Sequence, residues 1–142
     1  MATTRRVPEL TLAGAQTAVE AALARAKELG VEVVVAATDR AGRLLAFARM
    51  DGAFVLSIEV AVKKAKTVCL AAGAATAGLW EVFGNDPELL HGLAPKLDDV
   101  VPVGGGVPIT VDGELAGAVG VSGATAAQDA DIAAAGAAAV SD

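Results

Sequence analysis

Three charged residues form the strongest candidate for a chemical site. Arg49 ends a predicted strand, Asp51 follows at a turn, and Lys66 lies on the next predicted helix. If the three side chains converge, Arg49 and Lys66 can bind a carboxylate while Asp51 moves a proton. The alternative is structural: Arg49 and Asp51 form a salt bridge, and Lys66 is a solvated surface residue.

A run of three glycines, Gly104, Gly105 and Gly106, is the second candidate. Glycine permits positive φ and leaves backbone N–H groups uncovered, so the run can form a nest that binds an anion. The alternative is a tight crossing of two chain segments that leaves no room for side chains. The run is neither a P-loop nor a dinucleotide motif, because the required spacing and following helix are absent.

The beginning of the last predicted helix is the third candidate. Thr125 and Gln128 have the spacing of a capping box, and Asp129 falls in the first turn. Gly123 precedes the helix, whose free N–H groups favour a bound anion, and Asp129 is a further candidate for moving a proton. The alternative is plain capping, with Asp129 complementing the helix dipole.

Candidate iron ligands are few. His91 is the only histidine, Cys69 is the only cysteine, and the chain has no tyrosine. Haem iron is commonly held by His and in other proteins by Cys, Met or Tyr, so His91 is the candidate ligand for a haem iron. Cys69 and Met50 are more simply explained as apolar packing residues. One His and one Cys cannot supply a four-ligand zinc site.

Two hairpins and several helices are predicted to position these residues. The first helix runs from the N-cap Thr11 to the stop at Gly30, and Asp112-Gly113 is typical of a type I′ hairpin turn. Gly117 and Gly120 would let a backbone or ligand approach the last strand. The other predicted strands are 31–38, 43–50, 109–111 and 114–122, and a loop is predicted over 101–109. The other predicted helices are one that begins at Phe54 or Ser57 and ends at Leu70, and those over 75–82, 87–93 and 125–140.

This order of elements, α-β-β-α-α-β-β-α, predicts an α+β fold in which helices pack on an antiparallel sheet. Residues 1–9 are predicted to form a flexible N-terminal arm, and residues 10–142 a single domain. The length of 142 residues fits one domain with a real core.

Composition excludes several classes of protein. Hydrophobic residues make up 54% of the chain, which rules out disorder. The net charge of −6 and the 3% of aromatic residues argue against a nucleic-acid partner. The longest apolar run, 132–140, is too short to span a membrane. With one cysteine and no secretory signal, the chain is predicted to be cytoplasmic, and its small apolar side chains suggest burial in a homo-oligomer.

The chain resembles the haem-degrading/GlcG-like domain family, which includes HbpS-like proteins and the C-terminal domain of PduO-type proteins. The resemblance implies a profilin-like sandwich with a five-stranded antiparallel sheet, assembled as a symmetric oligomer. This sequence departs from the family where Gly104 replaces the second proline of the loop, and it lacks the signal peptide of the secreted haem-binding members. The matching stretches are residues 10–12, 39–53, 57–66, 101–109, 117–123 and 128–129.

Three functions are compatible with these observations. The first is binding of a planar or anionic small molecule, with haem as the ligand that the resemblance implies, and haem breakdown if the iron stays open to oxygen or peroxide. The propionates of haem would form ion pairs with Arg and Lys side chains. The site would lie between the glycine run, the start of the last helix and the set of Arg49, Asp51 and Lys66. The second is a cofactor-independent isomerase or lyase acting on a small carboxylate or carbonyl substrate. The third is a non-catalytic oligomeric accessory protein.

Overall fold

Two antiparallel hairpins build the sheet. In the computed structural model, which describes residues 1–142, the first hairpin consists of β1 (Val34–Asp39) and β2 (Leu44–Arg49), and the second of β3 (Gly106–Val111) and β4 (Glu114–Ser122). β1 and β4 pair in the centre, so that the strand order is β2-β1-β4-β3. The turn of the second hairpin has positive φ at both Asp112 and Gly113, which confirms the predicted type I′ turn.

The expectation of a five-stranded sheet is wrong, because the sheet has four strands. The chain supplies only two hairpins, and the long segment between them turns into helices and loops. Within this segment lie α3 (Thr76–Gly84), η1 (Glu88–Leu93) and η2 (Ala94–Lys96). The strand after the glycine run also begins earlier than predicted, at Gly106, because this residue already pairs with Gly120 of β4. The α+β class and the order of the elements are confirmed.

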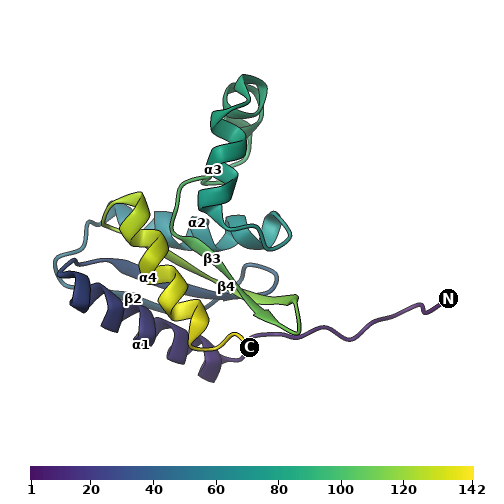
Figure 1. The fold of residues 1–142 in the computed structure, drawn as a ribbon, viewed down its shortest axis with the longest axis horizontal. Coiled ribbons are helices and arrows are strands. Elements are labelled where there is room, and N and C mark those ends of the chain that lie inside the picture. Colours follow the sequence, from purple (N-terminus) through teal and green to yellow (C-terminus); the bar gives the residue numbers. More distant parts are fainter.

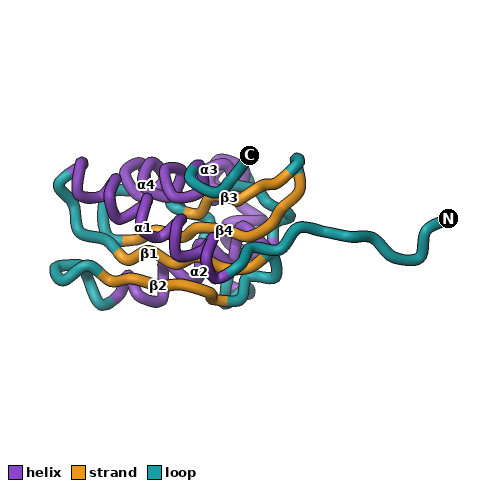
Figure 2. The backbone as a smooth tube through the Cα atoms, turned by 90° about the horizontal axis from the view of Figure 1, so that it is seen from below, coloured by secondary structure: helices purple, strands orange, loops and turns teal.

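Helices cover both faces of the sheet. α1 (Leu12–Leu29) and α4 (Ala126–Ala138) pack side by side on one face, and α2 (Leu56–Leu70) crosses the other (Figures 1 and 2). Every residue of β1 is buried, as a central strand covered on both faces requires. Its side chains alternate accordingly: Val35 belongs to the core under α1 and α4, and Val34 to the smaller core under α2.

Close packing on the α2 face depends on glycine. A Cβ atom at Gly120 would collide with the Ala61 carbonyl oxygen of α2, which confirms that a backbone approaches this point of β4 closely. The predicted caps are present as well. The Thr11 hydroxyl accepts from the Gly14 N–H at 3.1 Å, and Gly30 ends α1 with a φ of +69°. Thr125 and Gln128 form the full capping box of α4.

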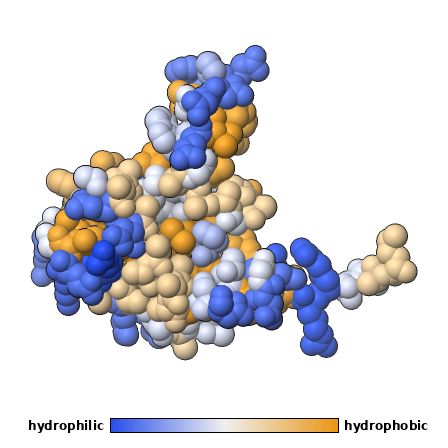
Figure 3. Space-filling view, viewed as in Figure 1, coloured by the Kyte–Doolittle hydropathy of each residue, from blue (hydrophilic) through white to orange (hydrophobic).

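The segment from α3 to η2 stands out from the body of the domain (Figure 1). Its side chains include large apolar groups in contact with solvent, among them Trp80, Val82 and Leu93, and Figure 3 shows apolar surface along this projection. At the other end, residues 1–9 form no helix or strand and lead away from the body. None of the helices combines the length and the apolar character that crossing a bilayer requires.

Candidate functional site

The structure separates the three charged residues of the strongest predicted set. Arg49 and Asp51 line a groove at the far end of β2, together with Lys27 and Glu32. Lys66 lies near the opposite end, where its side chain packs beside Gly42 in the turn of the first hairpin. The two ends of β2 are about 16 Å apart at the rise of an extended strand. The alternative salt bridge between Arg49 and Asp51 is also absent from the ion pairs of the structure.

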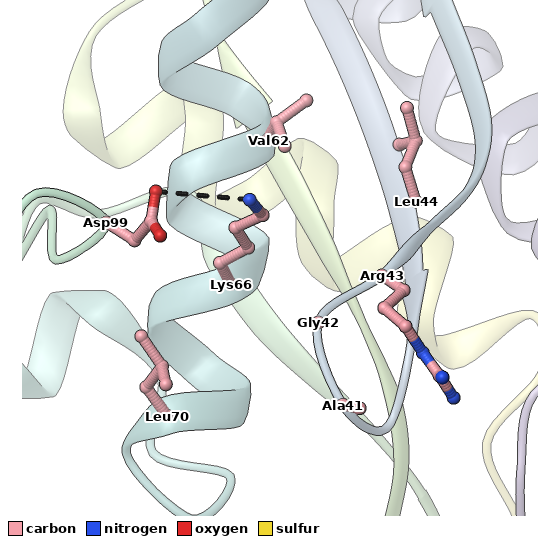
Figure 4. A pocket seen from close by; sticks show the side chains of 8 residues that line it. All are labelled: Ala41, Gly42, Arg43, Leu44, Val62, Lys66, Leu70 and Asp99. Atoms are coloured by element: carbon pink, nitrogen blue, oxygen red, sulfur yellow. Dashed lines mark ion pairs between the residues drawn. The ribbon is translucent and has the colours of Figure 1, made fainter.

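Lys66 instead lines a hollow between α2 and the first hairpin, here called the Lys66 hollow. Its volume of about 460 Å³ lies within the range of small-molecule sites. Val62 of α2 and Leu44 of β2 form apolar walls, and the Lys66 ammonium points into the space below them (Figure 4). The lining residues are Ala41, Gly42, Arg43, Leu44, Val62, Lys66, Leu70 and Asp99.

The charges around this hollow are unequal. The Lys66 Nζ lies 3.9 Å from the Asp99 Oδ1, and both side chains are partly exposed. The Arg43 side chain runs away from Lys66 (Figure 4), and its Nε donates to the Asp39 Oδ2 at 2.7 Å. Lys66 is therefore the cation that faces the hollow, with Asp99 as its counter-ion.

An apolar hollow of about 260 Å³ adjoins the Lys66 hollow. Leu70 lines both, and the segment carrying Asp99 and Val100 forms a wall of each. The side chains of Leu79 and Phe83 from α3 contribute to the apolar hollow. The two hollows together present one charged and one apolar region along α2.

The glycine run wraps around a lysine that was not among the predicted site residues. Gly104, Gly105 and Gly106 are all buried. A Cβ atom at Gly105 would lie 2.8 Å from the Lys64 Nζ, and one at Gly106 would lie 2.6 Å from the Lys64 carbonyl oxygen. One at Gly104 would lie 2.9 Å from the Ala126 carbonyl oxygen, and none of the three glycines lines a main surface hollow. This geometry favours the tight crossing over the anion nest.

Asp129 faces the same lysine. The Lys64 Nζ donates to the Asp129 Oδ2 at 3.0 Å and to the Val121 carbonyl oxygen at 2.9 Å. The Asp129 Oδ1 accepts from the Ala124 N–H at 2.9 Å. Both charged side chains are at most 4% exposed, so Asp129 has no path to a ligand in the hollows described. Gly123, with a φ of +138°, makes the turn just before this helix start.

Sequence reasoning missed Lys64, although a signal was present. Lys64 lies three residues after Ala61 and four before Val68, both of which are in the buried stripe of α2. A lysine in an apolar helical stripe must find a buried partner. The buried carboxylate of the last helix, Asp129, is that partner.

The candidate iron ligands lie apart from one another. His91 is exposed on η1, in the projecting segment, and lines none of the main hollows. The Met50 Sδ accepts from the Val33 N–H at 3.3 Å. The Cys69 Sγ donates to the Asp39 carbonyl oxygen at 3.5 Å, and burial raises the pKa of this thiol. None of the residues lining the Lys66 hollow is a His, Cys, Met or Tyr.

Comparison with known proteins finds a family and several relatives that this chain matches. Residues 10–138 match the family described as "Haem degrading protein HbpS-like". An uncharacterized 15.0 kDa protein of Citrobacter freundii, from the dhaT-dhaS intergenic region, is 36% identical over 88% of this chain and 87% of its own length.

Two solved structures have the same fold along nearly their whole length. A double mutant of HbpS from Streptomyces reticuli superposes with a TM-score of 0.86 at 32% identity, covering 98% of this chain and 92% of that one. A PduOC:haem complex superposes with a TM-score of 0.84 at 37% identity, covering 93% of this chain and 95% of that one.

Proposed function

The chain belongs to the HbpS-like family of haem-degrading proteins, and we propose that it binds haem in the Lys66 hollow. The observation that carries the proposal is the amphipathic character of that hollow, where a lysine ammonium stands between apolar walls. The existence of a haem complex of the related PduOC supports the choice of ligand.

The propionates and the apolar edges of haem are the groups that would contact the hollow. The propionates are anionic, and the Lys66 ammonium is the group that would bind one of them. The faces and apolar edges of the macrocycle would pack against Val62, Leu44 and Leu70, with the adjoining apolar hollow as continuation. The lining holds none of the side chains that commonly ligate haem iron, namely His, Cys, Met and Tyr. The hollow would therefore hold a propionate and exclude water from one face of the macrocycle.

A haem titration tests the proposal. Wild-type protein is expected to shift the Soret band with saturation, and Lys66→Ala is expected to weaken haem binding about tenfold, since a charge-assisted contact contributes about 1.5 kcal/mol or more. Lys63→Ala is the matched control, because Lys63 lies on the same helix outside the lining of the hollow. Equal affinities of wild type and Lys66→Ala would remove the hollow from the proposal.

The same titration decides the role of His91. Since His91 is exposed and outside the hollow, His91→Ala is expected to leave the Soret spectrum and affinity unchanged. Loss of the spectral shift in His91→Ala would instead make His91 the iron ligand and move the haem to the projecting segment.

We also propose that the chain assembles with copies of itself. The support is the exposed apolar surface of the projection, where Trp80 is 51% and Val82 is 55% exposed, because surface of this kind is typical of interaction sites. Light scattering coupled to size-exclusion chromatography tests it, and a mass equal to one chain at micromolar concentration would contradict it.

A further inference from the structure

We propose that Asp99 sets the charge selectivity of the Lys66 hollow, by competing with an anionic ligand for the Lys66 ammonium. The inference rests on the proposed function, since it concerns the binding of a carboxylate in that hollow. Asp99 is the only acidic residue in the lining and faces Lys66, the cation that would bind a propionate.

The contact between the two groups is weak enough to be exchanged. At 3.9 Å between Nζ and Oδ1 the pair is too long for a hydrogen bond, and the side chains of Lys66 and Asp99 are 38% and 48% exposed. Exposed pairs of this kind contribute little to stability. A ligand carboxylate can therefore take the place of Asp99 at Lys66 with little loss to the fold.

Asp99 nevertheless cannot move far from the hollow, because its backbone is anchored. The buried Thr67 hydroxyl accepts from the Val101 N–H at 2.9 Å. Its single proton is shared between the carbonyl oxygens of Lys63, at 2.7 Å, and Asp99, at 2.9 Å. The anchor fixes the segment from Asp99 to Val101 against α2. A bound anion would thus contact the Lys66 ammonium but would remain near the displaced Asp99 carboxylate, which repels it.

Removing the charge of Asp99 should therefore tighten the binding of anions. Two unit charges about 4 Å apart in water interact by about 1 kcal/mol, so Asp99→Asn is expected to bind a porphyrin dicarboxylate about fivefold more tightly. A ligand without carboxylates should bind to both forms equally. The effect should shrink in high salt, because the groups are partly exposed.

The test uses two iron-free probes, protoporphyrin IX and its dimethyl ester, and follows porphyrin fluorescence on titration with the full chain. Asp98→Asn is the matched control, since it removes the same charge from the adjacent residue, which is exposed and does not line the hollow. The inference predicts tighter dicarboxylate binding by Asp99→Asn, a smaller effect of Asp98→Asn, and no effect of either on the ester.

Three outcomes would overturn the inference. Unchanged or weaker dicarboxylate binding by Asp99→Asn would contradict competition between Asp99 and the ligand for Lys66. Equal effects of Asp99→Asn and Asp98→Asn would mean that only the net charge of the protein matters. An equal gain for the ester would mean that polarity rather than ligand charge is responsible. If wild-type protein binds neither porphyrin, the proposed function fails together with the inference, and this result differs from the other three in the wild-type titration itself.

The role of the Thr67 hydroxyl as the anchor of Asp99 can be tested separately, by porphyrin titration of Thr67 variants. Thr67→Ser keeps the hydroxyl and should preserve the fivefold effect of Asp99→Asn. Thr67→Val removes it, frees the Asp99 backbone, and should reduce that effect in the double variant to less than about twofold. A full effect of Asp99→Asn in the Thr67→Val background would show that Thr67 does not position Asp99.

Discussion

Replacement of Lys64 by methionine is expected to destabilise the fold by about 3–5 kcal/mol, the cost of breaking a buried ion pair from one side. The side chains of Lys64 and Asp129 are 3% and 4% exposed. Methionine would leave the Asp129 carboxylate buried with only the Ala124 N–H as partner, and the Val121 carbonyl oxygen would lose its lysine donor. A buried charge left in this way keeps its full desolvation penalty.

Urea unfolding followed by circular dichroism measures this cost. Lys63→Met is the matched control: Lys63 pairs with Glu59, whose side chain is 73% exposed, and loss of this pair should cost no more than about 1 kcal/mol. Removing both buried charges, in Lys64→Met with Asp129→Leu, should restore at least half of the loss, because no unpaired charge remains. A cost of Lys64→Met no greater than that of Lys63→Met, or a double variant less stable than Lys64→Met, would contradict a penalty from the unpaired Asp129 charge.

Three further predictions concern single residues. Gly105→Ala should lower the unfolding free energy by about 2 kcal/mol or more in urea melts, because a Cβ atom there meets the Val121 carbonyl oxygen and φ is +134°. Burial alone would raise the pKa of Asp39, but hydrogen bonds from the Arg43 N–H and guanidinium hold this pKa below the ordinary value of an aspartate. The charged Asp39 therefore stabilises the fold above about pH 4, and this contribution is lost as the pH falls through the lowered pKa, so Asp39→Asn should flatten the acid side of the stability profile. Burial raises the pKa of Cys69, so its reaction with a disulfide reagent at pH 8 should be slower than that of free cysteine and should speed up on unfolding.

Local signals in the sequence predicted local structure well. Thr11 and Gly30 mark the two ends of α1, and Asp112-Gly113 forms the hairpin turn that its residue types indicate. In each case the deciding interaction joins residues within four positions of each other, so no knowledge of the tertiary fold was needed. The fifth strand, by contrast, came from the family resemblance and not from any pattern of residues in the chain.

The candidate site was harder to predict, because it depends on distances across the fold. Arg49 and Lys66 were grouped by residue type, yet the direction of β2 places them at opposite ends of a strand. Asp99 joins the hollow through the long segment after η2, which has no periodic pattern from which its path could be read. The partnership of Lys64 and Asp129 spans 65 positions, and only the packing of α4 against the sheet brings them together.

The close fit of Gly105 over the Lys64 ammonium has an evolutionary consequence. Neither residue can change alone without cost: a side chain at Gly105 would occupy the space of the lysine head group, whereas loss of the lysine would open a cavity beneath the glycine. The glycine should be kept among relatives even where the lysine is not, because the Val121 carbonyl oxygen and the φ of +134° also exclude a side chain there. Where a shorter, uncharged side chain stands in place of the lysine, Asp129 should be replaced along with it.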